Sequence, residues 1–302
     1  MSRIVCIGGA TVDRKYRASE PVRPGTSNPV ASERSFGGVA RNVAENLARL
    51  GVETSLVSIV GDDENGRAIL AALQSLGIDP RGVAVAADRT TAEYVAVLHP
   101  DGELALGLAD MSIFDGLTPA LLSEVWPGLS QGSLFADCNL PAETLRELIV
   151  LCRRQSLPLA IDAVSAPKVM RLPRDLTGIG TLFLNLDEAR AFLDSPGIPS
   201  IEAVEALLDH GAASVVLTLG PAGLIAAAPS GAVKIEAVKT EIVDATGAGD
   251  ALIAATLAAQ LQGRSLEEAA RTGTAAAALT LQSRQSVRPD LSPALLDRAL
   301  LA

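Results

Sequence analysis

Short runs of β-branched and other apolar residues alternate along this chain with longer amphipathic stretches rich in alanine and leucine. Strand-like runs cover residues 3–9, 54–61, 132–139, 157–162, 181–185 and 214–220. Helical spacing of apolar positions covers residues 39–51, 66–77 and 142–155, and residues 251–261 are apolar enough for a buried helix. Strand and helix in repeated alternation predict an α/β fold, in which helices cover both faces of a mostly parallel sheet.

Two segments interrupt this alternation. Residues 14–36 are polar and rich in proline, and residues 91–109 form two strand-like runs around Pro100-Asp101-Gly102, a strong hairpin signal. No linker divides the chain, so we expect a single domain over residues 1–302 with inserted lid segments at about 14–36 and 88–112. Ligands of open α/β sheets bind beyond the carboxyl ends of the strands, where a small β flap would act as a lid. An edge hairpin or a dimer contact is the alternative, and one flap can serve both purposes.

Composition narrows the classes of function. The chain has 302 residues, 48% of them hydrophobic, and a net charge of −10, which argues against nucleic acid or anionic lipid as the main partner. Three cysteines without metal-ligand spacing, no signal peptide and no membrane-spanning run predict a cytoplasmic protein. His99 lies in a turn and His210 at a helix end, so a catalytic proton acceptor is expected to be a carboxylate.

The stretch DATGAGD, residues 244–250, places small residues directly before the buried helix. Gly247, Ala248 and Gly249 would let a phosphate approach the unpaired N–H groups of the helix start. Asp250, in the first turn, could accept a proton from a hydroxyl brought to the same place, as phosphoryl transfer requires. A tight loop followed by an acid that favours a helix start explains the same residues equally well.

Three further positions suggest binding chemistry. Gly37 and Gly38 precede an amphipathic helix, and Asn42 lies inside that helix although asparagine is a poor helix former. Asp13 follows the first strand, where a carboxylate could grip hydroxyl groups, although acids in solvated loops are common.

Asn185 and Glu188, three residues apart after the strand at 181–185, could share a helix face near a metal-bound phosphate. A helix N-cap with an acid in the first turn is the alternative.

These motifs, in this order, resemble the PfkB family of carbohydrate and nucleoside kinases, which share the ribokinase fold. The resemblance rests on the Gly-Gly pair with Asn42, on Asn185-x-x-Glu188, on the stretch from Thr218 to Gly223, and on Asp244–Asp250. It implies a three-layer α/β/α fold, ATP with Mg²⁺ held by Glu188, and K⁺ as a further candidate cation. It also implies Asp250 as general base, residues 247–249 as anion hole, and sugar hydroxyls held by Asp13, Gly38 and Asn42. The residues implied to border the nucleotide are Asn185, Thr218, Gly220, Gly223 and Thr246.

Several stretches resemble the pseudouridine kinases of that family. They are Ser27-Asn28-Pro29, Ala109-Asp110-Met111, residues 136–139, residues 162–165 with Lys168, and residues 288–292. Asp162-Ala-Val replaces the Asp-x-Asn common in the sugar kinases, which favours a nucleoside-like acceptor. Thr11 and Ala245 also depart from the usual residues without affecting the inferred chemistry.

The acceptor expected from this resemblance is the 5′-hydroxyl of pseudouridine. The expected partners of the uracil ring are Asn28, Asn139 and Lys168, and the lid is expected to join two copies in a homodimer. Another acceptor of the family (ribose, another nucleoside or a ketohexose) and a non-catalytic nucleoside-binding protein remain the alternatives.

Overall fold

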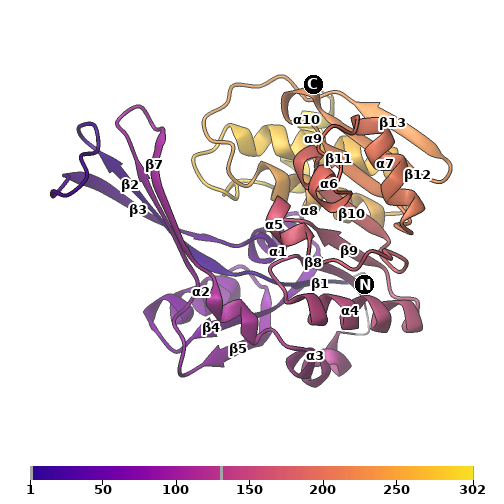
Figure 1. Ribbon diagram of the computed structural model, residues 1–302, viewed down its shortest axis with the longest axis horizontal. Helices are drawn as coiled ribbons and strands as arrows, with labels where there is room; N and C mark the ends of the chain where they lie inside the picture. Colours follow the sequence, from indigo (N-terminus) through magenta and orange to yellow (C-terminus); the bar gives the residue numbers. More distant parts are fainter. Residues whose placement is uncertain (1–2, 130–131, 302) are drawn as a thin grey trace.

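A nine-stranded sheet forms the centre of the protein, and helices cover both of its faces (Figure 1). The computed structural model describes residues 3–129 and 132–301. The strand order is β13-β12-β11-β10-β9-β8-β1-β4-β5, and the neighbours from β11 to β5 pair in parallel. The strands are β1 (Arg3–Ile7), β4 (Glu53–Gly61), β5 (Asp79–Ala86), β8 (Ser133–Asp137), β9 (Leu159–Asp162), β10 (Thr181–Asn185), β11 (Val215–Thr218), β12 (Leu224–Ala228) and β13 (Gly231–Ile235).

Alternate side chains of each central strand enter two separate cores. In β1, Ile4 and Cys6 pack on one side of the sheet, whereas Val5 and Ile7 pack on the other. The first side is covered by α1 (Val39–Arg49), α2 (Glu64–Ser75), α8 (Ala248–Leu261) and α9 (Leu266–Leu281), with α10 (Pro293–Leu301) against α9. The second side is covered by α3 (Pro119–Val125), α4 (Ala142–Gln155), α6 (Leu186–Phe192) and α7 (Ser200–Asp209). The predicted three-layer α/β/α architecture is therefore confirmed.

A second, four-stranded sheet projects from the body as a lid (Figure 1). Its order is β3-β2-β6-β7, built from β2 (Thr11–Ala18), β3 (Val30–Gly37), β6 (Glu93–Leu98) and β7 (Leu104–Asp110). β6 and β7 form the hairpin predicted around Pro100-Asp101-Gly102, whereas β2 and β6 pair in parallel. The lid leaves the body beside the carboxyl end of β1, because only residues 8–10 separate β1 from β2.

The carboxyl ends of the parallel strands bring polar residues to one edge of the sheet. Asp137, Asp162, Asn185 and Thr218 are the last residues of β8, β9, β10 and β11. The short helix α5 (Ala166–Val169) and the 3₁₀ turns at Ser112–Gly116, Trp126–Gly128 and Gly220–Ala222 complete the described elements. No helix in residues 3–129 and 132–301 is long and apolar enough to cross a membrane.

Candidate active site

The start of α8 has an open face, formed by the glycine-rich stretch. Gly247 is the N-cap residue, with a φ of 81°, and a β-carbon there would collide with the carbonyl oxygen of Ser286. Gly249, one residue inside the helix, is different, since a β-carbon there would have no neighbour within 4 Å. Ala248 and Gly249 line a cleft of about 700 Å³. The unpaired N–H groups of the helix start therefore lie where an anion could reach them.

Asp250 lies in the first turn of α8. The residue is partly exposed to solvent, but protein groups surround its carboxyl. Desolvation by burial raises the pKa of this carboxyl to about 7. The amide nitrogen of Asn42 donates a hydrogen bond to its Oδ2 at 2.8 Å and acts against that rise. A carboxylate with a pKa near 7 is matched to general-base catalysis at neutral pH.

Asp13 lies on β2, at the base of the lid. Thr11 donates a hydrogen bond to its Oδ1 at 2.9 Å, and burial raises the pKa of the carboxyl. A β-carbon at Gly37, on the adjacent strand, would strike the Asp13 carboxylate. Gly38, with a φ of 90°, lies where a β-carbon would strike the Gly9 carbonyl oxygen. Gly37 therefore leaves room for the Asp13 carboxylate, and Gly38 lets the chain before α1 approach the loop after β1 closely.

Asp137 organises this region, and the sequence interpretation assigned it no role. Its fully buried carboxylate accepts hydrogen bonds from three backbone N–H groups, those of Gly9 at 3.0 Å, Ala40 at 2.9 Å and Asn139 at 2.9 Å. The bond from Ala40 caps α1, whose own N-cap residue is a glycine without a side chain. Only its place at the end of a buried strand could have indicated this role from sequence.

Asn139 and Lys168 form a polar pair on the same side of the sheet edge. The Lys168 ammonium donates a hydrogen bond of 2.5 Å to the side-chain oxygen of Asn139. Burial lowers the pKa of Lys168. Arg171 donates to the backbone oxygen of Asn139 at 2.7 Å, which holds the loop that carries the pair. The structure therefore brings these two predicted base-binding residues together.

Asn28 lies away from the other predicted site residues of the same chain. It belongs to the loop between β2 and β3, at the tip of the lid, and five residues of β2 separate Asp13 from the end of that strand. At ~3.4 Å per residue this is roughly 17 Å. Its amide bonds within the loop, accepting from the Arg23 N–H at 2.9 Å and donating to the carbonyl oxygens of Arg23 and Thr26. A role for Asn28 in base binding remains a prediction.

The cleft beside α8 contains part of the expected nucleotide site. Thr218, Gly220 and Gly223 line it, together with Ala248 and Gly249. A β-carbon at Gly223 would meet the backbone oxygen of Ile235, so this glycine also allows the turn into β12 to pack closely. Thr246 is exposed in the loop before α8, where its N–H donates to Asp244 Oδ1 at 2.8 Å.

Asn185 and Glu188 form the capping box of α6. The Glu188 carboxylate accepts from the backbone and side-chain N–H groups of Asn185, each at 2.8 Å, and the Asn185 side chain accepts from Glu188 N–H. The pair therefore forms the helix N-cap that the sequence analysis gave as the alternative to a metal-binding role. Both oxygens of Glu188 still have free lone pairs.

Asp162 at the end of β9 and Glu188 in α6 are acids that lie close enough to repel one another. Burial raises the pKa of Glu188, and burial followed by repulsion from Glu188 and Asp250 raises that of Asp162 well above its usual value. Among the described residues, no three His, Cys, Asp or Glu side chains group closely enough to hold a metal alone. Mg²⁺ at phosphoryl-transfer sites usually takes only one or two protein carboxylates, completed by phosphates and water. Glu188 therefore fits the part of a single carboxylate ligand.

Comparison with known proteins agrees with this geometry. Residues 1–292 match the model of a family described as pfkB family carbohydrate kinase. The pseudouridine kinase of Escherichia coli K12 is 30% identical over 294 residues, which cover 96% of this chain and 93% of that protein. The guanosine-inosine kinase of Exiguobacterium acetylicum is 30% identical over 305 residues, covering 98% and 99%.

Solved structures share the fold over the whole chain. A carbohydrate kinase from Agrobacterium tumefaciens superposes with a TM-score of 0.89 at 34% identity, covering 99% of this chain and 97% of that one. An Arabidopsis thaliana ribokinase, solved in complex with ribose and ATP, gives a TM-score of 0.87 at 21% identity, covering 99% of both chains. The second likeness concerns the fold alone.

Proposed function

The chain belongs to the pfkB family of carbohydrate kinases, and from that premise we propose that it transfers the γ-phosphoryl group of ATP to the 5′-hydroxyl of pseudouridine. The products are ADP and pseudouridine 5′-phosphate. The observation that carries the proposal is the Asp250 carboxylate in the first turn of α8, beside the open face at Gly249. In this arrangement a carboxylate that could accept a proton and the unpaired N–H groups of a helix start lie within one turn of helix, which supports the proposal.

In the proposed reaction the acceptor oxygen forms a bond to the γ-phosphorus as the bond to the β-phosphate oxygen breaks. Asp250 takes the hydroxyl proton, and the N–H groups at residues 247–249 stabilise the charge that develops on the phosphoryl oxygens. Asp13 would hold ribose hydroxyls against the loop at Gly38. Asn42 would act on the base through its hydrogen bond to Asp250.

On the nucleotide side, Thr218, Gly220 and Gly223 would border ATP within the cleft. Asn185 and Thr246 remain proposed nucleotide contacts, and Glu188 would hold Mg²⁺. Bound at the phosphates, Mg²⁺ would neutralise part of their charge. K⁺ remains a candidate second cation, which replacement of KCl by NaCl in the assay would test.

The choice of pseudouridine within the family, made from the resemblance of several stretches, is supported by the Lys168–Asn139 pair. Uracil presents carbonyl oxygens and ring N–H groups, and the pair offers both the remaining ammonium donors and a free lone pair on the amide oxygen. Pseudouridine has a ring N1–H that uridine lacks, because a carbon–carbon bond joins its ribose and base. With uridine, the second lone pair of that amide oxygen would have no donor, and hydrogen-bonding sites discriminate on this ground.

A panel of acceptors tests the proposal. ADP release would be measured with ATP and pseudouridine, uridine, guanosine, inosine, ribose or fructose. We expect the highest kcat/KM for pseudouridine, at least ~tenfold above uridine, which corresponds to ~1.4 kcal/mol. A preference for guanosine, inosine or free ribose would overturn the acceptor and leave the kinase activity standing. Absence of ADP release with every acceptor of the panel would favour the non-catalytic alternative.

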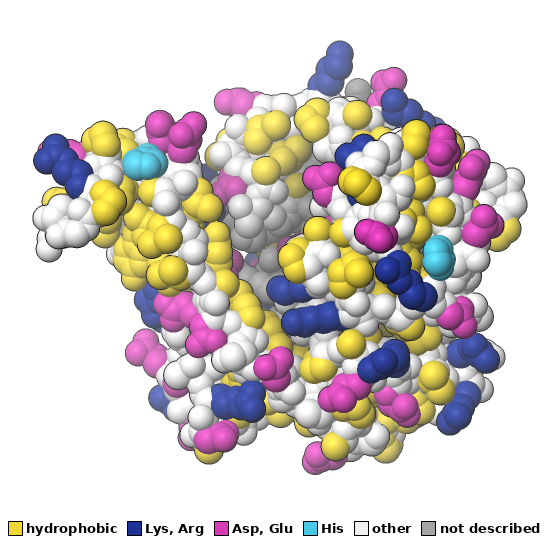
Figure 2. Space-filling model, viewed as in Figure 1, with side chains coloured by type: hydrophobic (Ala, Val, Ile, Leu, Met, Phe, Trp, Pro, Cys, Tyr) yellow, Lys and Arg dark blue, Asp and Glu magenta, His cyan; other side chains and the backbone are white. Residues whose placement is uncertain are grey.

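We also propose that the lid joins two copies of the chain. Asp13 pairs with Tyr94 across the lid, and Tyr94 pairs with Ala109, so Leu106 and Leu108 lie on the face opposite Asp13. Leu104 follows a register shift in β7 and lies beside Gly107, on the other face. Leu106 and Leu108 are 50% and 54% exposed, and hydrophobic side chains gather over the lid in Figure 2. An apolar sheet face of this kind is typical of an interaction surface.

A further inference from the structure

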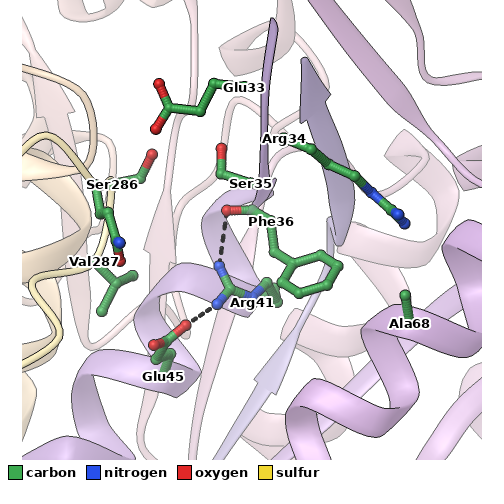
Figure 3. A pocket seen from close by; sticks show the side chains of 10 residues that line it. Glu33, Arg34, Ser35, Phe36, Arg41, Glu45, Ala68, Ser286 and Val287 are labelled. Atoms are coloured by element: carbon green, nitrogen blue, oxygen red, sulfur yellow. Dashed lines mark hydrogen bonds and ion pairs between the residues drawn. The ribbon is translucent and has the colours of Figure 1, made fainter. Parts of the chain in front are cut away.

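A single buried arginine holds the amide that contacts the candidate base. The Arg41 guanidinium donates to Asn42 Oδ1 at 2.6 Å and to the Phe36 carbonyl oxygen at 3.0 Å. It also forms an ion pair with Glu45, one turn further along α1, and is only 5% exposed. Figure 3 shows the guanidinium between Phe36 and Glu45. Both sides of its planar fork are therefore occupied by fixed acceptors.

The amide of Asn42 is asymmetric, and its orientation decides what Asp250 receives. Arg41 can only donate hydrogen bonds, so the amide oxygen of Asn42 must face it. The amide nitrogen then faces the Asp250 carboxylate, to which it donates at 2.8 Å. With Arg41 absent, the amide is free to turn its oxygen toward Asp250, which would favour the protonated acid over the carboxylate.

We propose that Arg41 is a positioning residue for the candidate base: by holding the oxygen of Asn42, it keeps the amide nitrogen on Asp250 and the carboxylate in its proton-accepting form. The inference rests on the proposed function, because it needs Asp250 to act as the base. It adds a role for a residue that contacts neither the acceptor nor the nucleotide in that proposal.

Most of the charged groups around Asp250 are acids, so Arg41 has few counterparts that stabilise the Asp250 carboxylate. Asp13 of β2 and Asp137 of β8 face the carboxyl and raise its pKa, and Asp162 of β9 repels it as well. Asn42 and Arg41 of α1 act in the opposite direction. Removing Arg41 therefore takes away both a positive charge and the restraint on the amide, and both losses raise the pKa of Asp250.

The space around Arg41 allows a direct test. A pocket of about 340 Å³ lies against it, and Phe36 and Glu45 are among the residues that line it (Figure 3). Arg41→Ala would open a cavity into this pocket, and a guanidinium ion could enter from solvent to occupy the vacated position. The Phe36 carbonyl and the Glu45 carboxylate would be in place to hold it.

The first measurement is kcat/KM against pH, with whichever acceptor of the panel is turned over best. In Arg41→Ala we expect the acid limb to move up by about one pH unit, the scale on which a nearby charge acts. Arg49→Ala is the matched control, since Arg49 also pairs with Glu45 but does not contact Asn42, and its limb should match the wild type. Equal limbs in all three proteins would overturn the proposal.

The second measurement is rescue of Arg41→Ala by guanidinium chloride in the tens of millimolar. We expect a saturable gain of at least fivefold and return of the acid limb toward its original position. Urea or NaCl at equal concentration should give no gain, nor should guanidinium added to Arg49→Ala. Absence of rescue in a folded Arg41→Ala would count against a positioning role.

Arg41→Ala could fail to fold because Glu45 loses one of its partners. In that case a double variant without either charge takes its place in the test. Arg41→Met/Glu45→Gln removes both charges at similar volume, and Glu45→Gln alone retains the contact between Arg41 and Asn42. The limb should move only in the double variant. Asp250→Asn separates the two proposals. Wild-type turnover in Asp250→Asn would overturn the proposal that Asp250 is the base. If Asp250→Asn is inactive and the acid limb of the Arg41 variants matches that of the wild type, only the present inference is overturned.

Discussion

Replacing Gly249 by alanine should make the protein at least as stable while removing most of its kinase activity. Gly249 is the second residue of α8, has no left-handed φ, and a β-carbon there would meet nothing within 4 Å. Alanine is favoured over glycine in a helix by about 0.5–1 kcal/mol. In a chain of this length, such a gain raises Tm by roughly 1–3 °C.

The same methyl group would stand where a phosphoryl group has to approach the helix start. Loss of one donor to a developing oxyanion typically costs about 10²–10³ in kcat, and we expect a loss of this order. Gly247→Ala is the control in the same loop. Its φ of 81° and the contact with Ser286 disfavour any β-carbon, so Tm should fall.

The assay is kcat/KM by coupled ADP release, with Tm measured on the unliganded proteins. The reasoning is refuted if Gly249→Ala keeps wild-type kcat/KM, because the open face at Gly249 would then not be an anion site. A fall in Tm equal to that of Gly247→Ala would show that Gly249 is required for the fold.

Three further predictions follow from the site and the lid. Asp250→Asn should lose ~10²–10⁴ in rate. Because the raised pKa of about 7 means that ionisation of Asp250 destabilises the fold, the Tm of Asp250→Asn should rise relative to that of the wild type from pH 5 to pH 8. A Tm difference that does not change with pH would contradict this. Lys168→Met and Asn139→Ala should each reduce the ratio of kcat/KM for pseudouridine over uridine, whereas an unchanged ratio would remove the pair from base recognition. Leu106→Lys should convert a dimer to a monomer by light scattering, and a dimer of unchanged stability would place the interface elsewhere.

Most of the central sheet could be predicted from sequence, because buried parallel strands are short apolar runs with helices between them. The prediction lacks three strands of that sheet, β5, β12 and β13, and for β5 and β13 their position gives the physical reason. β5 and β13 lie at the two edges of the sheet and are partly exposed, so they lack a continuous apolar run. β2 and β3 carry polar residues on both faces of an exposed lid, and the proline-rich segment between them hides their pairing.

The glycine-rich loop could be interpreted locally, because the residues that we propose to act together lie within one turn of helix. Asp137 could not. Its three hydrogen-bond donors come from the loop after β1, from the start of α1 and from its own strand end, so two of them are 128 and 97 residues away. A polar side chain that joins separate elements in this way has no signature in the spacing of neighbouring residues.

Asn42 shows how far local interpretation extends. The sequence marks it as an unfavourable residue inside a helix, which signals a function but not a partner. The partner, Asp250, is 208 residues away, and the residue that orients the amide is its immediate neighbour Arg41. Because burial already favours the neutral carboxyl and Asp13, Asp137 and Asp162 repel its charge, a pKa near 7 for the candidate base depends on this short chain of donors. The identity of the base can be predicted from one motif, whereas its protonation at neutral pH depends on contacts that only the fold creates.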